Sequence, residues 1–193
     1  MMLRTFIAVE IPSGIQTAIA NSTISLKNEL AKKLVRWVAP QNVHLTLKFL
    51  GDVSSTTIEH LAETLKREAA SHATFSMCVG GLGAFPTPRR VRVIWVGLEA
   101  PPALEALRRG VETAAAQLGY APEERPFSPH LTIGRVGQTA SASDLQRIRS
   151  ALEATKVGVL GTIRVDAVHI FKSDLQPGGS VYTHLYALPL KSI

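Results

Sequence analysis

Two short stretches decide the fold: His44-Leu45-Thr46-Leu47 and His130-Leu131-Thr132-Ile133. Each consists of His, Leu, Thr and an aliphatic residue, and a glycine follows each a few positions later. Successive side chains of a β-strand alternate between two faces. Each stretch therefore predicts a strand with His and Thr on one face and two aliphatic side chains on the other. The aliphatic face suits a core, and the polar face suits a ligand site.

Three residues, Lys48-Phe49-Leu50, extend the first copy before Gly51-Asp52. Strict alternation places Lys48 on the same face as His44, where it would meet phosphate or solvent. The same alternation places Phe49 in the core. The glycine and aspartate predict that the strand ends there.

The paired histidines indicate acid–base chemistry. An imidazole has an ordinary pKa of about 6.5, so near neutrality it can accept or donate a proton. Two histidines on opposite sides of one phosphorus can take a proton from an attacking nucleophile and give one to the leaving oxygen. Thr46 and Thr132 lie about 6–7 Å further along the same face of each strand. They are placed to donate hydrogen bonds to non-bridging phosphate oxygens. One His-x-Thr alone is more often an ordinary strand segment, so the inference depends on the pair.

Composition narrows the class of protein. The chain has 193 residues, 46% of them hydrophobic, and a mean hydropathy of +0.14, which predicts a folded protein with a sizeable core. The net charge of +6 favours an anionic partner, nucleic acid above all. No apolar run is long enough to cross a membrane and no signal peptide is visible, so we expect a cytoplasmic protein. A single cysteine excludes an intrachain disulfide, and no Cys/His or acidic cluster suggests a metal or another cofactor.

The remaining segments alternate between strand-like and helix-like patterns with several apparent hairpins, which predicts an α+β fold. The expected strands cover residues 3–11, 35–38, 44–50, 74–79, 91–98, 130–136, 157–171 (one or two strands) and 181–190. The expected helices cover residues 13–34, 57–70, 103–118 and 141–154. A glycine-rich segment at 80–83 lacks a following helix with a phosphate-binding lysine, so we expect a bulge or a turn there.

At these residues the chain resembles the 2H phosphoesterases, and among them the RNA 2′,3′-cyclic phosphodiesterases, once called 2′-5′ RNA ligases. The similarity is carried by Arg4–Pro12 (RTFIAVEIP), Arg36–Gly51 (RWVAPQNVHLTLKFLG) and Arg125–Gly137 (RPFSPHLTIGRVG), and the intervening elements follow the family's order. The resemblance implies a single domain, residues 1–193, made of two interleaved, pseudo-symmetric lobes. Antiparallel-rich sheets would flank a central cleft, with helices outside.

The resemblance also implies a reaction. RNA, or a nucleotide, that ends in a 2′,3′-cyclic phosphate would be hydrolysed to a 2′-phosphate without a metal ion, by a monomer. The family's general acid, general base and three phosphate-binding groups correspond here to His44, His130, Thr46, Thr132 and Arg135. In a regular strand Arg135 falls on the face opposite His130. A bulge or a strand end at Gly134 would bring it round.

Two other functions stay open. Run in reverse, with a ribose 5′-hydroxyl in place of water, the same acid–base pair would make an ATP-independent 2′-5′ RNA ligase. A non-catalytic module that binds RNA ends is the third possibility, although binding alone needs no pair of proton carriers. Phe49 and Phe127 are secondary candidates for stacking on a base. His60 and His72 lie on and at the end of an expected helix, and His169 and His184 lie in expected strands without a Thr two residues later. All four are expected to be structural, although His184 could approach the cleft.

Overall fold

The computed structural model describes residues 1–30, 34–177 and 179–192. Its strands are β1 (Met2–Glu10), β2 (Val35–Trp37), β3 (His44–Ser54), β4 (Phe75–Phe85), β5 (Val93–Glu99), β6 (His130–Val136), β7 (Val159–Val165), β8 (Ala167–Gln176) and β9 (Gly179–Pro189). Its helices are α1 (Ser13–Ser22), α2 (Ile24–Glu29), α3 (Ser55–Ser71), α4 (Pro102–Ala116) and α5 (Ala142–Ala154), with a 3-10 turn, η1 (Pro40–Asn42). The predicted α+β class is confirmed.

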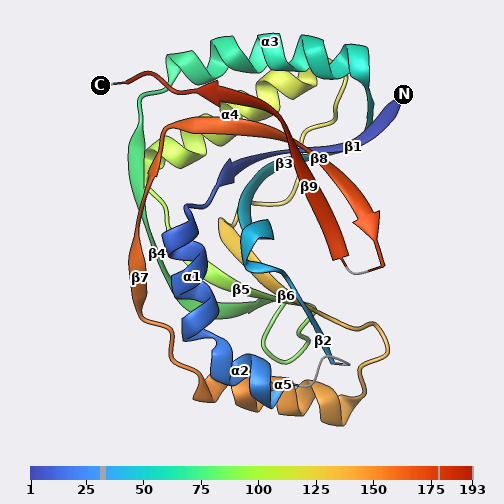
Figure 1. The fold of residues 1–193 in the computed structure, drawn as a ribbon, viewed down its shortest axis with the longest axis vertical. Helices are drawn as coiled ribbons and strands as arrows, with labels where there is room; N and C mark the ends of the chain where they lie inside the picture. The colour runs from blue at the N-terminus through green and yellow to red at the C-terminus, as the bar shows by residue number, and fades with distance from the viewer. Residues whose placement is uncertain (31–33, 178, 193) are drawn as a thin grey trace.

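The strands form two antiparallel sheets (Figure 1). Sheet A has the order β3-β1-β8-β9, and sheet B has the order β2-β6-β5-β4-β7. The strand β3 with the first His-Leu-Thr and the strand β6 with the second belong to different sheets and meet in the middle of the molecule. In both sheets the histidine strand is followed by three further strands: β1, β8 and β9 after β3, and β5, β4 and β7 after β6. Sheet B has one more strand, β2, on the other side of β6.

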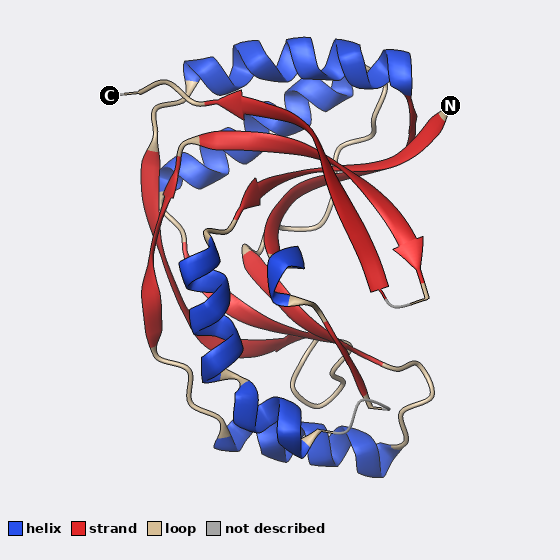
Figure 2. Ribbon diagram, viewed as in Figure 1, coloured by secondary structure: helices blue, strands red, loops and turns tan. Residues whose placement is uncertain are grey.

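Helices cover the two ends of the molecule, and strands cross its middle (Figure 2). Helices α3 and α4 pack together at the sheet A end, and α2 and α5 pack together at the sheet B end. No helix in the described part of the chain has the length and apolarity that crossing a bilayer requires.

The first strand is buried on both faces. Ile7 and Val9 enter the main core, which continues through both sheets. Phe6 and Ala8 point to the opposite face and pack with Phe171 in a small second cluster. This double burial explains why β1 is a nearly continuous apolar run, with little polar alternation.

A β-bulge interrupts β3 at the fourth residue of its repeat. Ala8 of β1 faces Thr46, but the preceding residue, Ile7, faces Lys48. Leu47 is therefore an extra residue in β3 without a partner in β1. One extra residue reverses the alternation of side chains beyond it.

The bulge in β3 overturns two predictions made from strict alternation. Lys48, predicted beside His44, is only 6% exposed, and its Nζ pairs with Glu112 at 2.5 Å and donates to the carbonyl of Ala121 at 2.9 Å. Phe49, predicted in the core, is 52% exposed. Both predictions were wrong because the lysine now points into the protein and the phenylalanine turns outward.

The second repeat carries the same bulge. Trp95 of β5 faces Thr132, but its neighbour Ile94 faces Gly134, which leaves Ile133 as the extra residue of β6. Ile133 and Gly134 are buried, and Arg135 is exposed. The bulge therefore moves Arg135 to the other face of the strand. It lies at Ile133, one residue before Gly134, where the sequence analysis expected a bulge or a strand end.

Helix prediction was least accurate between residues 13 and 34. The structure has two short helices there, broken at Thr23, and residues 31–33 of the predicted helix lie outside the described residues. The buried hydroxyl of Thr23 donates to the carbonyl of Ile19 at 2.8 Å. Such a bond to the fourth preceding carbonyl competes with regular helix geometry.

Two glycine-containing segments lie within strands. The prediction that β3 ends at Gly51-Asp52 was wrong, because the strand continues to Ser54. Gly51 adopts a positive φ of 73° and still pairs with β1. The segment 80–83 lies inside β4, where the register shifts between Gly80 and Leu82. The predicted bulge is confirmed there, and the alternative of a turn was wrong.

Replacing Lys48 with Ala should lower the free energy of unfolding by about 3 kcal/mol, because it leaves the Glu112 carboxylate buried without its closest cation. Arg108, 3.5 Å from the same carboxylate, offsets part of the loss. Urea denaturation followed by circular dichroism measures the change. The exposed Lys66→Ala on α3 is the control and should stay within about 0.5 kcal/mol of wild type. Equal stability of the two variants would contradict the prediction.

Candidate active site

Each histidine of the repeat is oriented by a backbone carbonyl two residues before it. Nδ1 of His44 lies 2.7 Å from the carbonyl oxygen of Asn42, and Nδ1 of His130 lies 2.7 Å from that of Ser128. A carbonyl oxygen only accepts, so Nδ1 carries the proton in both rings. In a neutral ring Nε2 is then the acceptor, and in a charged ring it is a donor. The two imidazoles are therefore held in the same tautomer with Nε2 available to a ligand.

Aromatic side chains fix both rings from the side. The ring of His44 lies 4.7 Å from that of Phe6 and meets the ring of Tyr182 edge-on at 5.1 Å. The ring of His130 meets Phe85 edge-on at 4.9 Å. Packing of this kind restricts the rotamers of catalytic groups and pre-organises the site.

The electrostatic environment connects the two strands. Burial lowers the pKa of His44 below 6.5, although the carbonyl of Asn42 opposes this effect. The positive charges of Arg135 and His130, both on β6, lower the pKa of His44 further. These charges reach His44 because β3 and β6 pack against each other.

The threonines lie just before the bulges. Thr46 and Thr132 are half-buried, two residues beyond the histidines. Among the described residues, neither hydroxyl has a hydrogen-bond partner. Both are free to donate to a ligand on the histidine face.

Phe49, a stacking candidate that strict alternation placed in the core, belongs to an aromatic surface of sheet A. Phe49 stacks in parallel on Phe6, with ring centroids 6.0 Å apart, and Phe6 in turn touches the ring of His44. The guanidinium of Arg4 lies 4.9 Å from the centre of the Phe49 ring. Phe49 therefore offers an exposed ring close to the histidine, and the bulge that turns it outward has no signal in the local sequence. Phe127, the other aromatic candidate, is occupied by the guanidinium of Arg108 at 5.2 Å.

Three residues that the sequence analysis treated as structural, or did not consider, come together beside His44. Glu10, His169 and His184 each offer one ligand atom, and these atoms lie within 4.8 Å of one another. Glu10 is the cross-strand partner of His44. Two imidazoles and a carboxylate suit a first-row divalent ion. Burial lowers the pKa of His169, whose buried Nδ1 has no partner in the described residues.

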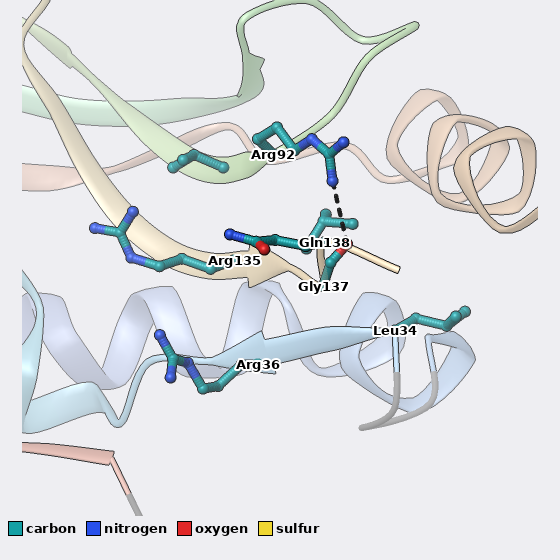
Figure 3. A pocket seen from close by; sticks show the side chains of 8 residues that line it. Leu34, Arg36, Arg92, Arg135, Gly137 and Gln138 are labelled. Carbon is teal, nitrogen blue, oxygen red and sulfur yellow. Dashed lines mark hydrogen bonds between the residues drawn. The ribbon is translucent and has the colours of Figure 1, made fainter. Parts of the chain in front are cut away.

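A pocket of about 860 Å³ adjoins Arg135 (Figure 3). Arg36 and Arg92 also line it, together with Gln138. Only Arg135 was expected from the sequence. The sequence could not show that Arg36 lies beside it, because this depends on the pairing of β2 with β6.

Nuclear magnetic resonance of the imidazole nitrogens should find the Nδ1–H tautomer in both His44 and His130 when the rings are neutral. It should also find that His44 titrates below the ordinary 6.5, because burial and nearby positive charge disfavour its imidazolium form. The exposed His60 on α3, which has no such carbonyl partner, serves as the reference resonance. An Nε2–H tautomer at either position would contradict the geometry.

Comparison with known proteins identifies the family. The sequence family described as the 2′-5′ RNA ligase superfamily matches residues 15–177. An RNA 2′,3′-cyclic phosphodiesterase of Methanothermobacter thermautotrophicus is 32% identical over 185 residues, covering 96% of this chain and 97% of that protein. Another, of Thermotoga maritima, is 31% identical over 190 residues, covering 95% and 94%. The crystal structure of E. coli LigT complexed with 3′-AMP has 25% identity and a TM-score of 0.76, covering 98% of this chain and 99% of that one. With its two His-Leu-Thr strands and this match over most of its length, the chain belongs to the 2′-5′ RNA ligase superfamily of 2H phosphoesterases.

Proposed function

We propose that this protein hydrolyses the terminal 2′,3′-cyclic phosphate of RNA to a 2′-phosphate, with the phosphate bound between His44 and His130. The observation that carries the proposal is the matched setting of the two imidazoles: each Nδ1 is held by a carbonyl, each Nε2 is free, and the strands come from opposite sheets. The relatives at 31–32% identity that are named RNA 2′,3′-cyclic phosphodiesterases support the same reaction.

His130 acts as the general base and His44 as the general acid. Nε2 of His130 takes a proton from water as the water oxygen bonds to phosphorus. The bond from phosphorus to the 3′ oxygen breaks, and Nε2 of His44 gives its proton to that oxygen. The products are a 2′-phosphate and a 3′-hydroxyl. Exchange of one proton with solvent at each histidine restores the starting state.

The remaining groups stabilise the charge that grows on the phosphate oxygens. Thr46 and Thr132 donate hydrogen bonds from the two strands, and the Arg135 guanidinium supplies a fixed positive charge. A bound phosphate anion also offsets the effect of Arg135 on His44, which favours the charged, proton-donating form of His44.

No metal ion takes part in the proposed mechanism. The proton transfers are assigned to the two histidines, and charge stabilisation to the threonines and the arginine. The set of Glu10, His169 and His184 has no role in these steps. Assays in the presence of a chelator test this assignment directly.

Ligation is the competing activity. The superfamily to which the chain belongs is named for 2′-5′ RNA ligases. By microscopic reversibility, a ribose hydroxyl in the position of the attacking water would yield a new phosphodiester with the same acid and base. An assay that offers a 5′-hydroxyl RNA together with the cyclic end, without ATP, measures the two outcomes in one mixture.

His44→Ala and His130→Ala should each reduce the hydrolysis of a nucleoside 2′,3′-cyclic phosphate by about 10²–10⁴-fold, because each removes one proton-transfer group. The reaction, run with EDTA and analysed by chromatography, should give the 2′-phosphate. His60→Ala, on the exposed surface of α3, is the control and should retain full activity. Persistent turnover in both active-site variants would exclude the mechanism. A 3′-phosphate product would show that the bond to the 2′ oxygen is broken instead. Dependence on a divalent ion would refute the metal-free reaction.

Arg135→Ala should move the alkaline limb of the pH dependence of kcat/KM to higher pH. The general acid must be protonated, so activity falls as the pH rises through the pKa of His44 in the free enzyme. Loss of the nearby positive charge raises that pKa. Arg135→Lys keeps the charge and should leave the limb close to its wild-type position. An unchanged pH dependence in Arg135→Ala would contradict the electrostatic link between Arg135 and His44.

A further inference from the structure

We propose that the pocket beside Arg135 binds the phosphodiester linkage that precedes the terminal nucleoside of RNA, so that the protein prefers an RNA chain end to a free cyclic nucleotide. This rests on the proposed function, because it assumes that the cyclic end lies between His44 and His130. The residues assigned to the linkage are Arg36, Arg92 and Gln138, which line the pocket together with Arg135.

Three neighbouring strands bring the arginines together. Arg36 of β2 directly faces Arg135 of β6. On the other side of β6, Val93 faces Arg135, and Arg92 immediately precedes Val93. Figure 3 shows that Arg36 and Arg135 extend from their strands to the same side, and that the Gln138 amide lies between Arg135 and Arg92.

The structure gives these arginines no anionic partner. All three are exposed, and none takes part in an ion pair with a carboxylate in the described part of the chain. By contrast, Arg125 and Arg149 lie within 3 Å of glutamate oxygens. In the described part of the chain, one side-chain hydrogen bond involves these arginines: Nη1 of Arg92 donates to the carbonyl of Gly137 at 3.2 Å, which orients that guanidinium.

Placing two arginines directly opposite each other has a cost. Side chains at directly facing positions lie about 4.5–5.5 Å apart at Cβ, and like charges there repel. An anion bound between Arg36 and Arg135 would turn this repulsion into attraction. The facing pair is therefore unfavourable without a ligand and favourable when a phosphate lies between the two guanidinium groups.

Gly134 makes the close approach of β2 possible. A Cβ atom at this position would lie 2.8 Å from Val35 and 2.9 Å from the Trp37 ring. Both neighbours of Arg36 therefore pack onto the bare backbone of β6, which sets Arg36 in register with Arg135. The short strand β2 serves to position a charge next to the catalytic strand.

The chemistry of the pocket fits a phosphodiester. A guanidinium presents paired N–H donors that match two phosphate oxygens, and the amide of Gln138 adds a further donor. An RNA that ends in the active site continues in the 5′ direction, and its next anionic group is the preceding linkage. Arg135 borders both the cyclic phosphate and the pocket, so it connects the two binding sites.

The test compares the kcat/KM of a dinucleotide that ends in a 2′,3′-cyclic phosphate with that of the mononucleotide. Arg36→Ala and Arg92→Ala should each lower this ratio by about tenfold, the loss expected for one charge-assisted contact. A dinucleotide with a neutral methylphosphonate linkage should lower the ratio in the wild-type protein by a similar factor. In either variant, the methylphosphonate linkage should lower the ratio little further, because the substitution and the neutral linkage remove the same interaction.

Arg89→Ala is the matched control. It removes the same charge from the loop that leads to β5, but Arg89 does not line the pocket, so the ratio should stay within about twofold. An equal loss in this control would show diffuse attraction and overturn the proposal, as would an unchanged ratio in both pocket variants.

A binding measurement separates failure of this proposal from failure of the proposed function. If the wild-type protein turns over neither the mononucleotide nor the dinucleotide, the proposed function fails. Fluorescence anisotropy with an oligonucleotide that ends in a 2′-phosphate then still reports on the pocket. Each pocket variant should reduce the slope of log affinity against log salt by about one, and an unchanged slope would rule the pocket out as a phosphate site.

Discussion

One extra residue in each histidine strand is the constraint on which the site depends. In a regular strand, the residues beyond Thr46 and Thr132 would continue the same alternation, with Lys48 beside His44 and Arg135 turned away from His130. The bulges at Leu47 and Ile133 reverse this pattern at the same point of both repeats. As a result one strand presents Phe49 and the other presents Arg135, so two nearly identical stretches deliver an aromatic ring and a cation to a common face. The repeat is symmetric in its histidines and threonines and asymmetric in the groups that follow them.

The buried ion pair behind β3 is the counterpart of this exposed face. The bulge that turns Phe49 outward also turns Lys48 inward, where Glu112 and the carbonyl of Ala121 satisfy it. A lysine inside the protein without such partners would be strongly disfavoured. The position of α4 is therefore coupled to the geometry of the strand that begins with His44, and packing on one side of β3 supports chemistry on the other.

Much of the fold could be read from local pattern, and the failures share a physical cause. Period-two alternation identified β6 with its observed bounds and the first seven residues of β3. Strict alternation misplaced Lys48 and Phe49 because a bulge is set by the register between strands that are distant in sequence. The same reason explains why Arg36 was not grouped with Arg135 and why Glu10, His169 and His184 were not seen as a set. Each of these groupings exists only after separate strands have paired.

The strand order of sheet A has a consequence for how the molecule assembles. β1 comes from residues 2–10, yet it pairs on one side with β3 and on the other with β8, from residues 167–176. Pairing between segments so far apart carries a large loop-closure cost and is typically slow. Every strand of sheet B has left the ribosome once residue 165 has emerged, whereas the sheet that carries His44 must wait for β8 and β9. Sheet B can thus form during synthesis, whereas the sheet that carries His44 is complete only after the β8–β9 hairpin has paired with β1.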